Sequence, residues 1–378
     1  MTHDRNRAPA DTTTGAGTRE FPAGHADHVV TPGDSIQAAV DDASAGDVIG
    51  VEPGTYTEQV VLDEQVTLAG AGRGETTVRS PESLDASFTR DGDEFHPVVF
   101  AERDGATVGD LTVDGNRRGD GNEAFVGVGG HDVSLRLDGV EVRDVAESSP
   151  DGTRHGFGVL VYVDDGARHE VAIERCEVHG YQRGGIVGDG DGLTIYVEET
   201  NVTGRNSTAP VRQNGVQVSD VDRATVVGCT ITDNYHAETT LASGIAAIDS
   251  SDIFVAWNRI ERNDVGITAR ETDDAVVRRN NVHTNGMGVL NLGSAAFDAT
   301  NNWWGADDGP SPPSVEAGGT SAAESAPTPD GSGDVVYNVE WQPCSEERFD
   351  LHPSVHGGRG ARPADDADAD PHGRQDIR

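Results

Sequence analysis

The feature that most constrains this chain is a short motif that recurs six times between Gly158 and Gly305. Each copy is a triplet ending in an aliphatic or aromatic residue, and most copies are followed by a turn and a Gly-aliphatic pair. The triplets are Cys176–Val178, Thr200–Val202, Cys229–Ile231, Asn258–Ile260, Asn280–Val282 and Asn301–Trp303. The clearest interval is 22 residues, from Ile260 to Val282. A repeat of this length indicates a solenoid, in which each unit buries its apolar face only against its neighbours.

The residue types within the repeat indicate strands. Leucine is too sparse for a leucine-rich repeat, and helical repeats would need stripes of strong helix formers. Short runs of Val, Ile and Thr separated by Gly, Asn and Asp are typical of short strands joined by turns. A 22-residue unit has room for about three such strands, so we expect an all-β chain in which each unit is one coil of a parallel β-helix.

The repeat places equivalent residues in columns along this solenoid. The predicted inward apolar column is Val178, Val202, Ile231, Ile260, Val282 and Trp303. Two residues earlier, a second column ends in Asn258, Asn280 and Asn301, which we expect to form a ladder of hydrogen-bonded side-chain amides. Cys176 and Cys229 occupy this column two coils apart, too distant for a disulfide, and are expected to be buried.

The N-terminal part of the chain carries a family resemblance. Residues 31–43 predict a capped amphipathic helix, which would cover the open edge of the first coil. With residues 46–72, this helix strongly resembles the N-terminal module of right-handed parallel β-helix proteins of the pectin-lyase-like superfamily. The later coils, ending in NNWWG at 301–305, resemble the carbohydrate-binding and sugar-hydrolase repeats of periplasmic copper-accessory-like proteins. The resemblance implies a single-stranded, right-handed parallel β-helix with an N-terminal capping helix, and it leaves function open because this fold hosts lyases, hydrolases, epimerases and non-catalytic binders.

Composition along the chain predicts five segments. In order, they are a disordered or polar N-terminal segment (1–28), the β-helix domain (29–305), a Pro/Gly/Ser-rich linker (306–333), a terminal strand or cap (334–352) and a disordered acidic tail (353–378). A polar insertion, residues 85–96, interrupts an early coil.

The charge of the chain restricts its partners and its setting. The formal net charge is −38, and all 28 basic residues are arginines. Acidic charge spread through the repeats indicates a halophilic protein, because high salt screens the self-repulsion. The same charge argues against a nucleic acid partner. The chain contains no apolar run long enough to span a membrane and no signal-peptide core in residues 1–24, whereas the family resemblance implies an extracellular or cell-surface location.

Insertions at one turn predict the working face. Gly266 follows Ile260 by six positions, whereas Gly215 follows Val202 by 13. Insertions at equivalent turns of a solenoid project from the same side, so they should build a wall there. By resemblance, this wall lies beside the sheet that borders the substrate groove of pectin-lyase-like enzymes.

The wall supplies the predicted site. Tyr can stack on sugar rings, Arg can bind carboxylates, and Asp, Glu and His can transfer protons. The expected catalytic residues are Asp233, His236, Glu238, Arg183 and His155. The expected substrate-binding residues are Tyr181, Tyr235, Arg205, Arg212 and Gln217, with Asn234 on the same wall. The alternative is a solvated acidic loop surface that performs no chemistry.

Two further columns bear on the chemistry. The outward positions of the Gly strands, which include Leu160, Val187 and Gln217, hold no carboxylate, and this favours binding over β-elimination. The turn after each Gly strand is acidic, and Asp189 with Asp191 is the expected site for a calcium ion. The alternative is that these residues only form turns.

The sequence therefore predicts a saccharide-binding β-helix protein whose partner is a polysaccharide or another saccharide. If the protein is an enzyme, we expect a polysaccharide lyase or a glycoside hydrolase acting beside the insertions. The alternative is a non-catalytic surface or accessory scaffold that docks a protein or a cell-envelope polymer.

Overall fold

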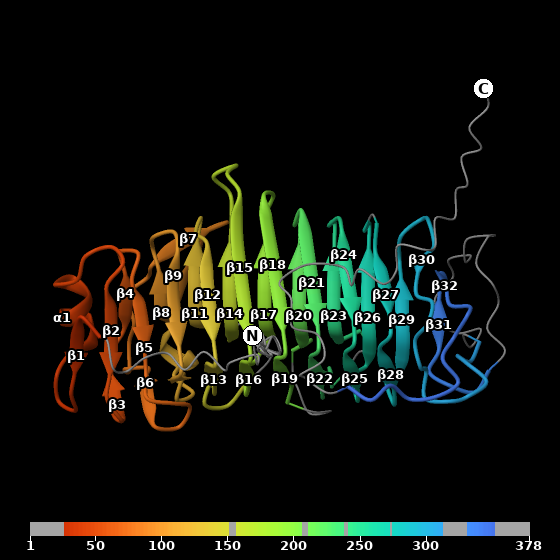
Figure 1. Cartoon of the computed structure of the whole chain (residues 1–378), viewed down its shortest axis with the longest axis horizontal. Coiled ribbons are helices and arrows are strands. Elements are labelled where there is room, and N and C mark those ends of the chain that lie inside the picture. The colour runs from red at the N-terminus through yellow and green to blue at the C-terminus, as the bar shows by residue number, and fades with distance from the viewer. Residues whose placement is uncertain are drawn as a thin grey trace, which may run out of the picture.

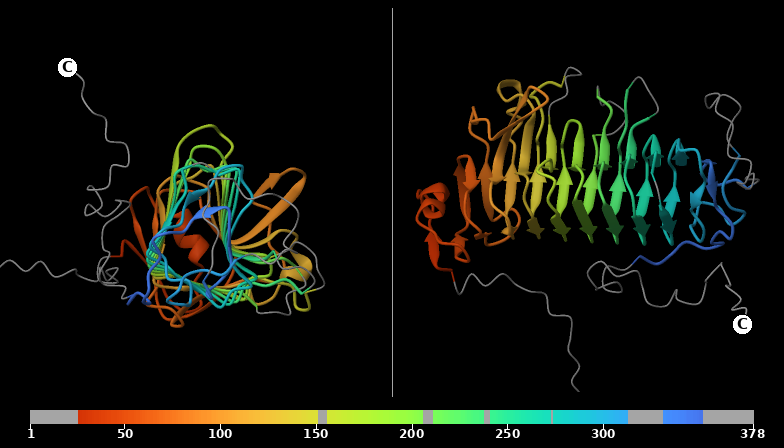
Figure 2. Two further views of the ribbon diagram at one scale, coloured as in Figure 1. Left: turned by 90° about the vertical axis from the view of Figure 1, so that its right-hand side faces the viewer. Right: turned by 90° about the horizontal axis from the view of Figure 1, so that it is seen from above.

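The computed structural model describes residues 26–150, 156–205, 211–237, 241–272, 274–312 and 331–351. The chain winds into a β-solenoid in which a typical coil adds one strand to each of three sheets (Figure 1). Viewed along its axis, the three sheets enclose a prism (Figure 2). All strand pairs along the three sheets are parallel, as the 22-residue repeat predicts. We name the sheets first, second and third in the order in which a coil visits them.

The first sheet has twelve strands. They are β1 (His28–Val30), β2 (Val48–Val51), β5 (Thr67–Ala69), β9 (Ala106–Gly109), β12 (Leu135–Asp138), β15 (His169–Glu174), β18 (Leu193–Glu198), β21 (Arg223–Val227), β24 (Ile253–Ala256), β27 (Val276–Arg278), β30 (Phe297–Asp298) and β32 (Val339–Glu340). The second sheet has nine strands. They are β3 (Gly54–Thr57), β6 (Thr76–Arg79), β10 (Thr112–Asp114), β13 (Glu141–Arg143), β16 (Glu177–His179), β19 (Asn201–Thr203), β22 (Thr230–Thr232), β25 (Arg259–Glu261) and β28 (Asn281–His283).

The third sheet contains the Gly strands that the sequence singled out. Its parallel strands are β4 (Val60–Leu62), β8 (Asp93–Ala101), β11 (Phe125–His131), β14 (Phe157–Tyr162), β17 (Gly184–Asp189), β20 (Asn214–Ser219), β23 (Ser243–Ile248), β26 (Val265–Arg270), β29 (Met287–Asn291) and β31 (Val336–Tyr337). One further strand, β7 (Phe88–Arg90), pairs with β8 antiparallel. The described part of the chain also contains the short 3-10 helix η2 (Gly119–Gly121).

The expected N-terminal helix is present as α1 (Ile36–Asp41), beside β1 and β2 at one end of the stack (Figure 1). Ser35 is its N-cap, as its hydroxyl accepts from the Ala38 amide. The Glu58 carboxylate also accepts from the Ile36 and Gln37 amides, at 2.9 and 3.1 Å. Ile36 and Val40 are the buried residues of the helix. None of the helices in the described ranges is long and apolar enough to cross a membrane.

The inward apolar column is confirmed through five coils. Val178, Val202, Ile231, Ile260 and Val282 pair in register through the second sheet and are all fully buried. At the sixth position of this column the prediction is wrong by one residue. Trp303 is only half-buried and pairs with Asn281, whereas Trp304 is fully buried.

The amide ladder is present with the same one-residue correction. The Asn258 amide donates to Asn280 Oδ1 at 3.0 Å, and the Asn280 amide donates to Asn302 Oδ1 at 3.0 Å. Asn301, the predicted member, is exposed with a φ of 56°. Two consecutive asparagines made the sequence register ambiguous, and burial of the Asn302 amide among backbone carbonyls settles it. Cys176 and Cys229 are buried and free.

A second amide ladder, which the sequence analysis missed, supports the turn between the second and third sheets. The Asn234 amide donates to Asn263 Oδ1 at 2.9 Å, and the Asn263 amide donates to Asn285 Oδ1 at 3.0 Å. The Asn285 amide then donates to Asp334 Oδ2 at 2.9 Å. Asn234 is therefore a buried structural residue and not part of a ligand-binding wall.

The insertion at residues 85–96 forms an arm that stands out from the solenoid (orange in Figure 2). Although the sequence of the insertion is polar, the arm makes an apolar contact. Phe88 packs over the outer face of the third sheet in an apolar cluster with Leu160 and Val187. These two residues do occupy outward positions, as expected, but they are buried. They therefore cannot form the floor of an open groove.

Candidate functional site

The turn between the first and second sheets decides which side chains reach the outer surface. Thr200, Cys229 and Asn258 point inward at the ladder position and are buried. The residue before each of them has a left-handed backbone, with φ values of 49° at Glu199, 68° at Gly228 and 59° at Trp257. The left-handed backbone points this one residue of each coil away from the core. The residues at this position therefore form a column on the surface.

The next residue in each coil begins a strand of the second sheet. Asn201, Thr230, Arg259 and Asn281 pair in register at this position. They face outward, because side chains alternate along a strand and the residue that follows each of them is in the buried apolar column. The two columns together form a polar strip with one Trp.

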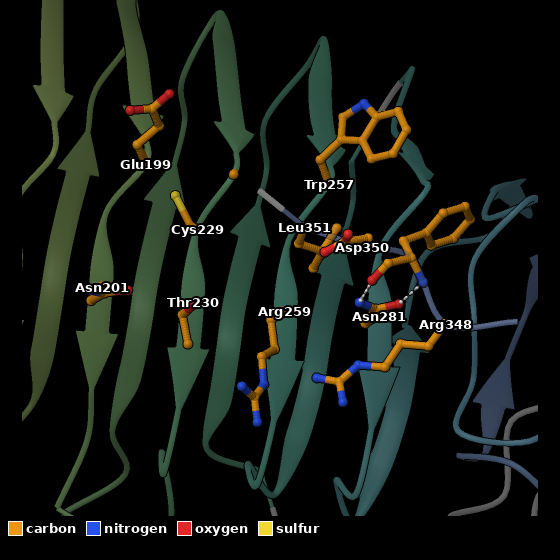
Figure 3. A pocket seen from close by; sticks show the side chains of 12 residues that line it. Glu199, Asn201, Cys229, Thr230, Trp257, Arg259, Asn281, Arg348, Asp350 and Leu351 are labelled. Carbon is orange, nitrogen blue, oxygen red and sulfur yellow. Dashed lines mark hydrogen bonds between the residues drawn. The ribbon is translucent and has the colours of Figure 1, made fainter. Parts of the chain in front are cut away.

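A cleft opens in this strip where one column lacks a side chain. Gly228 lies between Glu199 and Trp257 in the column of left-handed residues, and the two side chains flank its coil (Figure 3). A Cβ atom at Gly228 would lie 3.6 Å from Glu199 Cγ, which is ordinary contact. The glycine is therefore not required by local crowding, and its missing side chain leaves room above the sheet.

The other wall of the cleft comes from residues 348–351. Asn281 holds this segment at both polar atoms of its amide, since its Nδ2 donates to the Phe349 carbonyl at 3.0 Å and its Oδ1 accepts from the Phe349 amide at 2.9 Å (Figure 3). The Phe349 ring meets the Trp257 ring edge-on, with centroids 5.7 Å apart. Arg279 lies over the Trp257 ring at 5.2 Å.

The resulting cleft has a volume of 540 Å³. It is lined by Glu199, Asn201, Gly228, Cys229, Thr230, Trp257, Arg259, Asn281, Arg348, Phe349, Asp350 and Leu351. Two aromatic rings, two arginines, two carboxylates and two amides thus share one cavity. Its size lies within the range typical of small-molecule sites, roughly 300–1,000 Å³.

Arg259 has a buried donor that the described residues leave unused. Its Nη2 donates to Glu261 Oε1 at 2.7 Å, whereas its Nε is buried and has no hydrogen-bond acceptor within the described part of the chain. Burial raises the pKa of Glu261, but the Arg259 hydrogen bond and the charges of Arg259, Arg262 and His283 outweigh it, so the pKa is lowered. The Glu261 carboxylate thereby fixes the guanidinium at the edge of the cleft.

Two of the predicted catalytic residues, Asp233 and His236, lie elsewhere, at the turn between the second and third sheets. Asp233 binds Arg262 through both carboxylate oxygens, at 3.0 and 2.9 Å. The His236 amide donates to Asp264 Oδ2 at 2.9 Å. Glu238 and His155 lie outside the described residues. Asp233 and His236 therefore lie in the same turn region, and the Asp233 carboxylate is paired with Arg262.

Asp264 is an acidic group of this turn that the sequence analysis missed. Burial raises its pKa, and the hydrogen bonds from the His236 and Ala242 amides oppose that rise. Burial and the charges of Asp233 and Asp264 also raise the pKa of the half-buried Tyr235. Asp264 lies in a turn without an insertion, so the pattern of insertions in the sequence does not point to it.

The predicted substrate-binding residues do not form one surface. Tyr181 was assigned wrongly: it is fully buried, and its hydroxyl donates to Asn234 Oδ1 at 2.5 Å, so it cannot stack on a ligand. Arg205 is half-buried, and burial lowers its pKa. Arg212 is exposed. Gln217 accepts from the Asn214 amide at 2.7 Å within its own sheet.

Two of the remaining predicted residues contact the outer face of the third sheet. The Arg183 guanidinium lies 5.9 Å from the Phe157 ring centroid. Asp189, one of the two expected calcium ligands, is bound by Arg90 of the arm at 2.9 Å. Arg90 supplies the positive charge that a calcium ion would have supplied. Asp191, the second expected ligand, is exposed.

Comparisons with known proteins agree with the architecture. The family model for a right-handed β-helix region matches residues 157–303. The lacto-N-biosidase of family GH136 from Eubacterium ramulus is similar in structure, with a TM-score of 0.54, 13% identity, and coverage of 73% of this chain and 59% of that chain. The A-module of the mannuronan C-5 epimerase AlgE4 from Azotobacter vinelandii has a TM-score of 0.42, 19% identity, and coverage of 71% and 76%. No curated protein matches this chain in sequence.

Proposed function

We propose that this right-handed parallel β-helix protein binds a saccharide in the cleft between its second sheet and residues 348–351. The observation that carries the proposal is the combination of the Trp257 and Phe349 rings with the Arg259 and Arg348 guanidinium groups around one cavity. A sugar offers an apolar face of C–H groups to a ring and hydroxyl or carboxylate oxygens to an arginine.

The polar lining fits the same ligand class. Thr230 and Asn201 present a hydroxyl and an amide along the strip, and both groups can donate and accept. Arg259 and Arg348 add positive charge, which is scarce in a chain with a net charge of −38. Arginine binds carboxylates in a fork geometry, so we expect an acidic sugar, such as a uronate, to bind more tightly than a neutral one.

The relatives in structure make saccharides the first class to test. Lacto-N-biosidase and mannuronan epimerase are both named for saccharide substrates. At these identities the likeness supports the fold, and the cleft supports the ligand class. Turnover stays a separate prediction, which the sequence assigns to Asp233, His236 and Glu238.

The test is binding of uronate and neutral oligosaccharides to the full chain in molar salt, by isothermal titration calorimetry. Trp257→Asn removes the ring while keeping a residue that tolerates the φ of 59°. Burying an aromatic side chain contributes roughly 1.5–3 kcal/mol, so we expect about a 10- to 100-fold loss of affinity. Arg259→Gln should weaken uronates more than neutral sugars.

The matched control is Tyr196→Thr, which removes a half-exposed ring from the first sheet. It should bind like the unmodified chain. Absence of binding to every saccharide, or equal affinity in Trp257→Asn and the control, would refute the proposal. It would favour the scaffold alternative, in which the face docks a protein. Release of unsaturated or reducing ends from the same sugars would add catalysis to binding.

A further inference from the structure

A group of histidines and aspartates lies at the turn between the third and first sheets, away from the cleft. It draws on three successive coils. Asp104 precedes β9, and His131 ends β11 and is followed by Asp132. Asp164 and Asp165 lie between β14 and β15, and His169 begins β15. This connection is part of the edge of the solenoid above β14 and β15 in Figure 1. In the next coil, the same turn carries Asp189 and Asp191 but no histidine.

His169 is held between two carboxylates. Its Nδ1 lies 3.2 Å from Asp104 Oδ1, and its Nε2 lies 3.2 Å from both oxygens of Asp165. The side chain is only 4% exposed. A neutral imidazole has one N–H, so it can donate to only one of these carboxylates. The other contact needs a cation, which is either a second proton or a metal ion.

The arrangement matches the way proteins hold a metal-binding histidine. Such a histidine usually donates its second N–H to a carboxylate, which fixes the ring and its tautomer. Asp104 is in place for this role at Nδ1. Asp104 is itself held, since its Oδ1 accepts from the Ser134 amide at 2.6 Å. Nε2 of His169 is then left to face Asp165 and Asp132.

The donor atoms lie close enough together for small side-chain movements to bring them around one ion. One donor atom from each of Asp132, Asp165 and His169 lies within 4.8 Å of the others, and the same holds for His131, Asp132 and Asp164. Ligands about 2.0–2.2 Å from one ion lie about 3–4 Å from each other by simple geometry. Asp132 belongs to both triads, and its Oδ1 accepts from the Asp164 and Asp165 amides at 2.7 and 3.1 Å. The turn is therefore wrapped around this carboxylate.

The ligand types select the class of metal. Calcium and magnesium prefer shells made only of oxygen. Imidazole together with carboxylate suits zinc and other divalent first-row transition metals. Each triad offers one imidazole nitrogen and two carboxylates.

We propose that this turn binds a divalent first-row transition-metal ion through His169 Nε2, Asp165 and Asp132, with Asp104 as a positioning residue. The ion joins residues from two coils directly and a third coil through Asp104. The proposed metal site lies one coil before Asp189 and Asp191, where the sequence predicts a calcium ion. The proposal is independent of the saccharide cleft.

The test is titration of the untagged, chelator-treated full chain with zinc chloride by calorimetry, and with cobalt chloride by visible absorption. We expect saturable zinc binding and the d–d absorption of cobalt with nitrogen and oxygen ligands. Asp165→Asn keeps the oxygen that accepts from the Ala167 amide at 2.8 Å, so it should fold. It should lose at least tenfold in zinc affinity, and His169→Gln should do the same. Asp104→Asn should lose about 10- to 100-fold, as carboxylates behind metal-bound histidines do.

The matched control is Asp191→Asn, which removes one carboxylate from the same turn one coil later. It should bind zinc like the unmodified chain. The proposal is overturned if the unmodified chain does not bind zinc, if calcium binds at this turn more tightly than zinc, or if Asp165→Asn, confirmed as folded by circular dichroism, retains full affinity.

Discussion

The second amide ladder ends on a carboxylate, and this predicts an unusual dependence of stability on pH. Three of its four positions are Asn, which is neutral at every pH, and the last is Asp334. Asp334 Oδ2 accepts from the backbone and side-chain amides of Asn285, at 3.0 and 2.9 Å. Burial raises the pKa of Asp334 to about 6, from 3.8, although these hydrogen bonds oppose the rise.

The direction of the effect follows from the raised pKa. Between about pH 4 and pH 6 the folded protein keeps a proton on Asp334 that the unfolded chain has lost. The free energy of unfolding therefore falls as the pH rises through this window. A shift of about two pKa units corresponds to about 3 kcal/mol, present in full below pH 4 and lost above pH 6.

Asp334→Asn isolates this contribution, because an amide has nearly the same shape and does not ionise. Its oxygen can accept the two Asn285 hydrogen bonds. We expect the variant to match the unmodified chain near pH 4 and to be more stable at pH 7, by up to about 3 kcal/mol. The measurement is urea unfolding of both proteins across this range at constant salt.

Asp220→Asn controls for the loss of one negative charge, because Asp220 is an exposed turn residue with a φ of 54° that Asn tolerates. Its effect on stability should change much less between pH 4 and pH 7 than the effect of Asp334→Asn does. If Asp334→Asn lowers the free energy of unfolding by the same amount at pH 4 and at pH 7, then ionisation of Asp334 does not destabilise the folded protein. The reasoning from its burial would then be refuted.

Three other perturbations test the fold. Ile260→Asp should unfold the solenoid at pH 7, as seen by far-ultraviolet circular dichroism, because an unpaired buried carboxylate costs several kcal/mol, about 3 or more; a native spectrum would contradict the buried column. Phe88→Ser should expose Leu160 and Val187 and increase binding of a hydrophobic dye, and unchanged dye binding would show that the arm does not cover them. Raising salt from millimolar to molar should raise the melting temperature, since it screens a net charge of −38; a fall would argue against the halophilic interpretation.

Periodicity made the fold predictable. A column is visible in a sequence when the same position recurs at a constant interval, as Ile260 and Val282 do, and stacking then follows from burial. The register failed only at the last coil, where Asn301 and Asn302 are chemically identical. Burial within the stack distinguishes them, and sequence cannot.

The site was less predictable because it depends on contacts between residues whose separation in the sequence does not follow the repeat. The predicted wall residues share only their polarity and their place at an insertion, and polarity does not report burial. Tyr181 and Asn234 are hydrogen-bonded to each other inside the protein, although both lie in polar stretches of the sequence. The cleft joins the column of Trp257 to Phe349, a residue far along the chain in a segment without a repeat.

The sequence by itself determined the coil, its strands and its inward columns, because a solenoid builds each contact from the next repeat. Tertiary structure alone decided which polar groups remain available. Arg90 crosses from the arm to occupy Asp189, Arg262 occupies Asp233, and Phe349 closes a cavity around Trp257. These contacts join side chains whose separation follows no period. A carboxylate or a ring is free to act only when no such partner reaches it, and that depends on the packed chain as a whole.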